Sequence, residues 1–168
     1  MMMQLHFLLN TRELGIERHN VGAVVYCSEN IPFKEIVSKL SEVSECLNGF
    51  HTPIPKMFYS TYRVKEWDGK TTDGEQCIDL EDETINQDYA DFFGVEVLDG
   101  SMLDEKDGKD KVVINEAAVK VFGWTQPVGK KIAKLGKQYI VKGDIKNISY
   151  NAPIHPVAPA MFHLPDSR

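Results

Sequence analysis

The chain has 168 residues, of which 42% are hydrophobic and 26% are charged, and its formal net charge is −6. This balance is that of an ordinary globular protein, and it excludes a disordered or fibrous chain. Because an acidic chain lacks the positive charge with which proteins bind phosphate backbones, we expect no nucleic-acid partner. The longest apolar run, Val21–Cys27, is far shorter than the ~18 residues of a membrane span.

The first elements expected along the chain are a strand and a helix. Val21–Tyr26 is a β-branched apolar run, which is typical of a buried strand. Apolar residues then recur at helical spacing from Phe33 to Leu47, and Asn48-Gly49 is a helix stop signal. The pattern predicts a strand–helix unit with one apolar face on each element.

Two extended stretches follow this unit. Met57–Trp67 and Gln76–Glu83 have the composition of half-exposed strands, and turn signals stand between them at Asp68-Gly69 and Asp73-Gly74. Together they predict antiparallel β structure over residues 57–83, with an acidic outer face.

The rest of the chain consists of short elements bounded by caps and turns. Asn115 is a good helix N-cap, and Glu116 stands favourably beside the same helix N-terminus. The chain as a whole therefore predicts an α+β fold. In chain order, we expect a helix at Asn86–Phe93 ended by Gly94, a strand at Val95–Leu98 with a turn at Asp99-Gly100, a strand at Lys111–Ile114, a helix at Glu116–Phe122 ended by Gly123, strands at Lys130–Ala133 and Gln138–Ile145 around a Gly136 turn, and a strand at Ala160–Leu164.

Several features that resemble chemical motifs fail at a required position. Gly69-Lys70-Thr71 resembles the end of a phosphate-binding loop, but Val64 stands where that loop needs a glycine. The charged loop Asp104–Asp110 lacks the acidic first and last residues of an EF-hand. The five histidines show no metal-ligand spacing. We therefore expect no catalytic, cofactor-binding or metal-binding residue.

Three segments are candidates for a partner-binding surface: the acidic face 73–83, the charged loop 104–110 and the proline-rich loop 151–159. Solvation of the charged segments and packing of an extended tail are the alternative explanations. The residues singled out in these segments are Asp79, Glu81, Glu83, Asp104, Asp107, Tyr150 and His155.

A series of short motifs runs through the second half of the chain. In order, they are Asp88–Val95, Leu98–Gly100, Val112–Ala118, Phe122-Gly123, Pro127–Lys130, Tyr139–Ile145 and Pro153–Pro156. Their order and spacing resemble the extracytoplasmic core domain of MacB/FtsX-type ABC transporter permeases. Ser101, Lys142 and Asn147 depart from the family pattern, which usually has arginine, glycine or valine, and aspartate there. The motif glycines expected at turns or helix ends are Gly94, Gly100, Gly123, Gly129 and Gly143.

The resemblance implies a two-lobed MacB-like periplasmic domain. A porter-like lobe would comprise about residues 1–60 and 157–168, and an inserted β-rich lobe would comprise about residues 61–156. The flanking transmembrane helices of the family are absent from this chain. It looks like a fragment cut from between the first two membrane helices.

The resemblance also implies a function without catalysis or a cofactor. Such a domain faces the periplasm from the inner membrane of a bacterium, as part of a dimeric permease. It couples ATP hydrolysis by a separate cytoplasmic ATP-binding subunit to export or extraction of a substrate, or to regulation of a periplasmic protein or lipoprotein partner. Two alternatives remain open: a soluble binding or adaptor module, and a small hydrolase whose site forms only in space.

Overall fold

The structure, a computed structural model, describes residues 35, 39–40, 60–72, 76–149 and 156–164. The strand expected at Val21–Tyr26, the stop signal at Asn48-Gly49 and the turn at Asp73-Gly74 lie outside the described residues. So does most of the helix expected between Phe33 and Leu47. The fold below is therefore that of the second part of the chain, from residue 60 onward.

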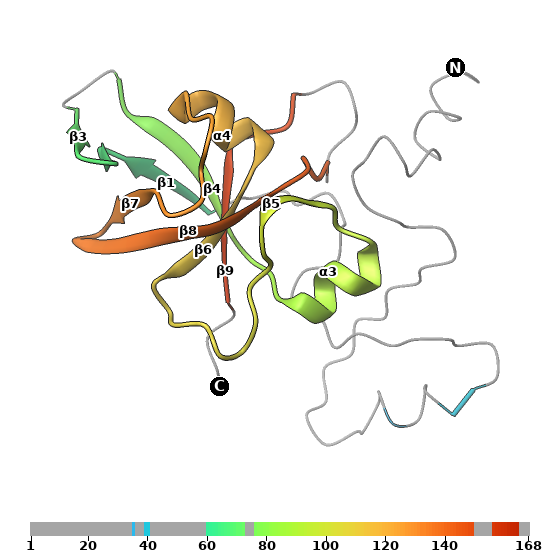
Figure 1. The fold of residues 1–168 in the computed structure, drawn as a ribbon. Helices are drawn as coiled ribbons and strands as arrows, with labels where there is room; N and C mark the ends of the chain where they lie inside the picture. Colours follow the sequence, from blue (N-terminus) through green and yellow to red (C-terminus); the bar gives the residue numbers. More distant parts are fainter. Residues whose placement is uncertain (1–34, 36–38, 41–59, 73–75, 150–155, 165–168) are drawn as a thin grey trace, which may run out of the picture.

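This part of the chain has an α+β fold, built from one mixed sheet and two short helices (Figure 1). In the described ranges the elements are β1 (Thr61–Val64), β2 (Glu66–Trp67), β3 (Lys70–Thr71), β4 (Ile78–Thr84), α3 (Gln87–Phe93), β5 (Val97–Gly100), β6 (Lys111–Asn115), α4 (Glu116–Phe122), β7 (Lys131–Lys134), β8 (Lys137–Ile145) and β9 (Ala160–His163). The predicted α+β class is thus confirmed.

The sheet curls so that its two sides meet. Its strand order is β1-β4-β9-β6-β8-β7-β2-β3, and β5 pairs with β8 beside this path. Only Lys65 separates β1 from β2, yet β1 pairs with β4 on one side of the sheet and β2 pairs with β7 on the other. The Tyr62 hydroxyl of β1 also accepts a hydrogen bond from the Leu135 N–H beyond β7, at 2.9 Å. The arrangement therefore approaches a small closed barrel.

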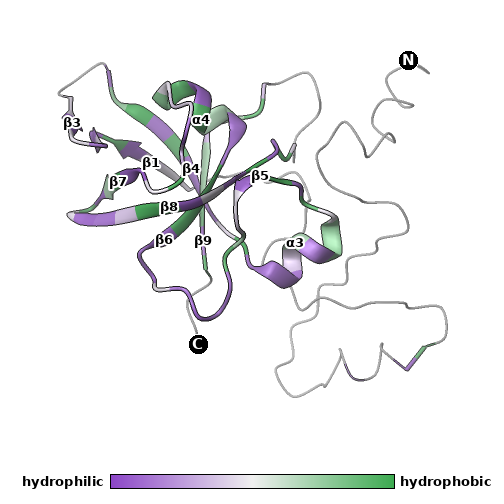
Figure 2. Ribbon diagram, in the orientation of Figure 1, coloured by the Kyte–Doolittle hydropathy of each residue, from purple (hydrophilic) through white to green (hydrophobic). Residues whose placement is uncertain are grey.

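Strand β6 is buried on both faces, which explains its uninterrupted apolar sequence. Val112 and Ile114 face the inside of the curled sheet, together with Ala118 and Phe122 of α4. Val113 points the other way, into a second cluster that α3 covers. Figure 2 shows the apolar residues on β6, β8 and α4 around which these clusters form. The two clusters hold both helices against one sheet.

Both helices begin and end where local signals place them. The side-chain oxygens of Asn86 and Asn115 accept the backbone N–H of the third residue onward, each at 2.9 Å. Gly94 and Gly123 end the two helices with φ of 61° and 68°, a left-handed conformation that glycine adopts without strain. The predicted helix Glu116–Phe122 is confirmed to the residue, and the other begins at Gln87 because Asn86 is its cap.

Two motif glycines lie inside strands, where turns were predicted. Gly100 ends β5, and it pairs with Gly143 in the middle of β8. A Cβ at Gly100 would lie 2.2 Å from the Lys142 carbonyl oxygen, and one at Gly143 would lie 2.6 Å from the Ser101 carbonyl oxygen. The turn predicted at Asp99-Gly100 is therefore wrong, as is the turn position of Gly143: these positions allow two backbones to approach closely.

The last strand lies inside the sheet. Strand β9 pairs in parallel with β4 and antiparallel with β6. This strand completes the sheet formed by residues 61–145, whereas the prediction grouped residues 157–168 with the first sixty residues. The rest of the proposed two-lobed division concerns residues outside the described part.

Candidate functional site

The acidic face expected at 73–83 is divided by the pleat of β4. Asp79 is exposed and lies opposite Arg63 of β1, whose Nε and Nη2 donate hydrogen bonds of 2.9 and 3.3 Å to its carboxylate. These bonds lower the pKa of Asp79 and raise the pKa of Arg63. Because the pair is open to solvent, its effect on stability is small. Asp79 is therefore accessible to a partner, although its charge is already paired.

The other two acidic candidates on β4 are less accessible. Glu81 is half-buried, opposite Ala160 of β9. Glu83 is only 6% exposed and lies opposite Phe162 of the same strand. The expectation that Glu83 belongs to a solvated acidic face is thus wrong. The reason is that β9 pairs with β4 beside Glu83, and nothing in the local sequence predicts this neighbour.

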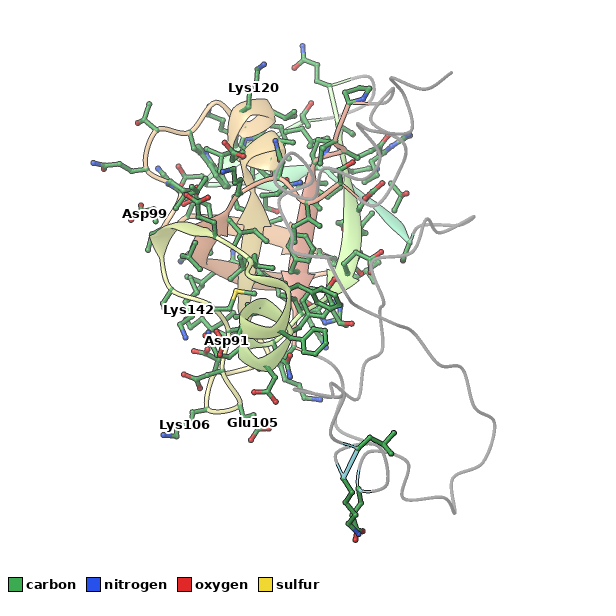
Figure 3. The ribbon with its side chains drawn as sticks, turned by 90° about the vertical axis from the view of Figure 1, so that its right-hand side faces the viewer. Asp91, Asp99, Glu105, Lys106, Lys120 and Lys142 are labelled. Atoms are coloured by element: carbon green, nitrogen blue, oxygen red, sulfur yellow. The ribbon has the colours of Figure 1, made fainter. Side chains whose placement is uncertain are left out.

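The charged loop 104–110 is an ordered structure anchored on β8. The Asp107 carboxylate accepts a hydrogen bond from Lys142 Nζ at 2.5 Å and another from the Asp104 backbone N–H at 2.8 Å. Partial burial acts to raise the pKa of Asp107, but these two bonds and the charges of Lys142 and Lys111 together outweigh it, and the net pKa is lowered. At the tip of the loop, the side chains of Glu105 and Lys106 point away from the sheet (Figure 3). The loop thus presents exposed charges at its tip, while the bonds of Asp107 hold it to β8.

The candidate residues do not form one continuous surface. Because β9 runs parallel to β4 and antiparallel to β6, the loop that leads into β6 lies beside the end of β4. Asp79 lies near the beginning of β4. The acidic strand and the charged loop therefore occupy opposite ends of the sheet. Tyr150 and His155 lie outside the described residues.

Asn115 connects two segments that are far apart in the sequence. Besides capping α4, its Oδ1 accepts a hydrogen bond from the Ala160 N–H at 2.9 Å, and its Nδ2 donates one to the Ala158 carbonyl at 2.8 Å. The side chain is almost fully buried. The sequence predicted the cap but not the other two bonds, since nothing local links residue 115 to residues 158 and 160.

A second pair of bonds reinforces the same place. The Glu116 carboxylate accepts a hydrogen bond from the Asn147 N–H at 2.9 Å, and the Asn147 side-chain oxygen accepts one from the Ala117 N–H at 3.0 Å. We call Asn115, Glu116 and Asn147, with residues 158–160, the α4 junction.

A largely buried ion pair joins two strands of the curled sheet, β4 and β7. Lys134 of β7 donates a short hydrogen bond to Asp82 of β4, and both side chains are 14% exposed. The Lys134 ammonium also lies 5.6 Å from the centre of the Tyr62 ring, and His163 Nε2 lies 3.7 Å from the other Asp82 oxygen. The signal that sequence reasoning missed is the alternation of β4, which places Asp82 on the same face as buried Leu80.

These contacts fix loops and helix ends rather than assemble reactive groups. Within the described ranges, no group of three or more histidine, cysteine, aspartate or glutamate residues is arranged to hold a metal ion. No helix in the part of the chain that the structure describes is both long enough and apolar enough to cross a membrane.

Comparisons with known proteins find similarity among solved structures alone, since no family model and no curated protein matches the chain. It is similar to the extracellular domain of the noncanonic ABC-type transporter YknZ from Gram-positive bacteria, at 23% identity and a TM-score of 0.44, over 63% of this chain and 50% of that one. It is also similar to a domain of a putative permease protein from Porphyromonas gingivalis, at 15% identity and a TM-score of 0.48, over 63% of this chain and 46% of that one. A third similar structure is the periplasmic region of MacB from Actinobacillus actinomycetemcomitans, at 18% identity and a TM-score of 0.40, over 65% of this chain and 50% of that one. The chain spans about half the length of each.

Proposed function

We propose that the chain is a non-catalytic extracytoplasmic domain of a bacterial ABC transporter permease of the MacB/FtsX type. In this proposal it faces the periplasm from the inner membrane, and transmembrane helices flank it in the full protein. A separate cytoplasmic subunit hydrolyses ATP, and two permeases form the working dimer. The energy then serves export or extraction of a substrate, or regulation of a periplasmic protein or lipoprotein.

The observation that carries the proposal is that separate family motifs meet in space. Glu116 and Ala117 of one motif exchange hydrogen bonds with Asn147, which lies two residues beyond the end of another. Gly100 and Gly143, again from two motifs, form one close backbone pair. The Gly129 N–H of a further motif donates to the Val141 carbonyl at 2.8 Å. Short motifs that match a family by chance are not expected to contact one another in the fold, so these contacts support the resemblance.

The described contacts also suit a part that transmits movement. A domain that follows membrane helices as a rigid body must not deform when one of its ends is pulled. The α4 junction and the buried Asp82–Lys134 pair each join segments remote in sequence. Both therefore oppose shear between the strands that they connect.

The partner-binding residues remain a part of this proposal. Asp79 and Asp104 are the accessible candidates, at two ends of the sheet, whereas the Asp107 side chain is only 15% exposed and is bound by Lys142. Glu81 is a marginal one because it is half-buried. Tyr150 and His155 stay as candidates from the sequence. Two separated surfaces suit contacts with two different proteins, or with two copies of one partner.

Cell topology of the full gene product tests the proposal. A single cysteine is placed at the exposed loop tip, Glu105→Cys, in a background with the three native cysteines replaced, and intact cells receive a membrane-impermeant maleimide. We expect the product in the membrane fraction and labelling once the outer membrane is made permeable. A cysteine at buried Ala118 is the control, and it should label only after unfolding. Labelling of Glu105→Cys only after cell lysis, with the product in the soluble fraction, would favour an adaptor module instead.

A further inference from the structure

Asp144 is a carboxyl group buried inside the sheet. Its residue is 7% exposed, and among the described residues no donor reaches its Oδ1. It lies on β8 between Asp99 of β5 on one side and Ile114 of β6 on the other. A buried polar atom without a partner is uncommon in folded proteins and calls for an explanation.

The electrostatic neighbours of Asp144 are themselves acidic. Asp99 faces it from β5, Glu116 faces it from α4, and β6 contributes the uncharged Ile114. Burial is the largest cause that raises the pKa of Asp144, followed by the charge of Asp99, while a backbone hydrogen bond acts against them. The lysines nearest in sequence are occupied elsewhere: the Lys142 and Lys146 ammonium groups bind Asp107 and Glu96.

The position of Asp144 makes its charge consequential for β5. Two backbone hydrogen bonds bracket the Asp99–Asp144 pair, from the Lys146 N–H to the Glu96 carbonyl at 2.9 Å and from the Ser101 N–H to the Lys142 carbonyl at 3.3 Å. All four residues of β5 are exposed, and among the described strands it pairs with β8 alone. Figure 3 shows Asp99 at the outer border of this region. Few contacts therefore hold β5 besides those around Asp144.

We propose that Asp144 makes the attachment of β5 to β8 sensitive to protons. With a proton, the carboxyl is neutral and has one donor of its own, so burial beside Asp99 and Glu116 costs little. Without it, an unpaired charge is buried beside two others, and β5 loosens. This property belongs to the folded chain itself and goes beyond the proposed function, although an extracytoplasmic domain would be exposed to changes of outside pH.

The sign of the effect follows from linkage. The folded state holds the Asp144 proton more tightly than the unfolded chain, whose aspartate pKa is about 3.9. The contribution of Asp144 to stability is therefore complete below the unfolded-state pKa and is lost as the pH rises through the folded-state pKa. Within that window, each pH unit raises the unfolding constant up to about tenfold relative to a chain without this carboxyl.

The test compares the full chain with Asp144→Asn and with Glu105→Gln, which removes an exposed carboxyl. Urea unfolding constants are measured from pH 3 to pH 8. We expect the wild-type constant, divided by that of Asp144→Asn, to rise above pH 4 and then level off. Glu105→Gln should follow the wild type. A ratio that stays flat across this range would overturn the proposal.

Hydrogen exchange locates the effect. In the wild type, the protection factors of the Lys146 and Ser101 amides should fall as the pH rises, and in Asp144→Asn they should not. The Val141 amide, which donates to the Lys130 carbonyl at 2.9 Å, reports on β7–β8 pairing and should stay protected. Asp99→Asn, which removes the like charge, should move the fall to lower pH. Equal protection in the wild type and in Asp144→Asn at every pH, or a fall in Val141 equal to that in Lys146, would refute the assignment to β5.

Discussion

Replacing Asn115 with alanine removes three hydrogen bonds at once. The loss of an N-cap costs about 1 kcal/mol. The Ala160 N–H and the Ala158 carbonyl also lose their partners, and each such loss costs about 1 kcal/mol or more when the group stays buried. We therefore expect Asn115→Ala to lower the free energy of unfolding by about 3 kcal/mol.

The chain offers a matched control in Asn86→Ala. Asn86 caps a helix of the same length, seven residues, and its side-chain oxygen accepts the Tyr89 N–H with no bond to a remote segment among the described residues. This variant should lose only about 1 kcal/mol. The assay is urea unfolding at neutral pH, followed by the fluorescence of Trp67 and Trp124. Equal losses in the two variants would refute the reasoning, because they would mean that the bonds to residues 158 and 160 contribute nothing.

Three further variants test other contacts. Lys142→Met should raise the pKa of Asp107 towards its ordinary value, which carboxyl NMR titration measures. In the wild type, the lowered pKa of Asp107 stabilises the fold above the unfolded-state pKa, and this stability is lost as the pH falls through the folded-state pKa. The variant should lack this contribution. Gly143→Ala should cost about 2 kcal/mol in urea unfolding, because the added Cβ meets backbone oxygens that have no room to move. Lys134→Met should cost about 3 kcal/mol, because it leaves Asp82 buried without its cation, and Lys134→Met with Asp82→Leu should recover much of this in thermal unfolding.

Each variant has a control that separates the contact from a general effect. Lys106→Met removes a lysine from the exposed loop tip and should leave the Asp107 titration unchanged. Gly136→Ala adds a methyl group in open space at a positive φ, so its cost is limited to backbone strain of about 1 kcal/mol. The first prediction is contradicted if the Asp107 titration is unchanged in Lys142→Met. The second is contradicted if Gly143→Ala and Gly136→Ala cost the same. The third is contradicted if the double variant is no more stable than Lys134→Met.

Local chemistry predicted the boundaries of both described helices well. Caps and turns act within three or four residues, so Asn115, Gly94 and Gly123 mark the helices from the sequence alone. The same holds for the turn at Asp68-Gly69, where both residues have positive φ. The predicted strand pair around Gly136 is confirmed as β7 and β8. These features depend on neighbours along the chain and not on what packs above them.

The contacts that position the candidate site depend on partners far away in the sequence. Asp82 meets Lys134 across 52 residues, and Asn115 meets Ala160 across 45. The burial of Glu83 depends likewise on β9, which the sequence placed in another lobe. Strand register and sheet order follow from the packing of whole faces, and one chain read by itself carries little of that information.

The place of β9 has a consequence for the order of folding. A growing chain has made β4 and β6 long before Ala160–His163 exists, and until then each of these strands lacks the neighbour that β9 provides. Such open strand edges invite pairing with other chains. Closure of the sheet must therefore wait until Ala160–His163 has been synthesised, and long-range pairing of this kind is slow. A shortened chain that stops before residue 160 would leave the edges of β4 and β6 permanently unpaired, and it should aggregate.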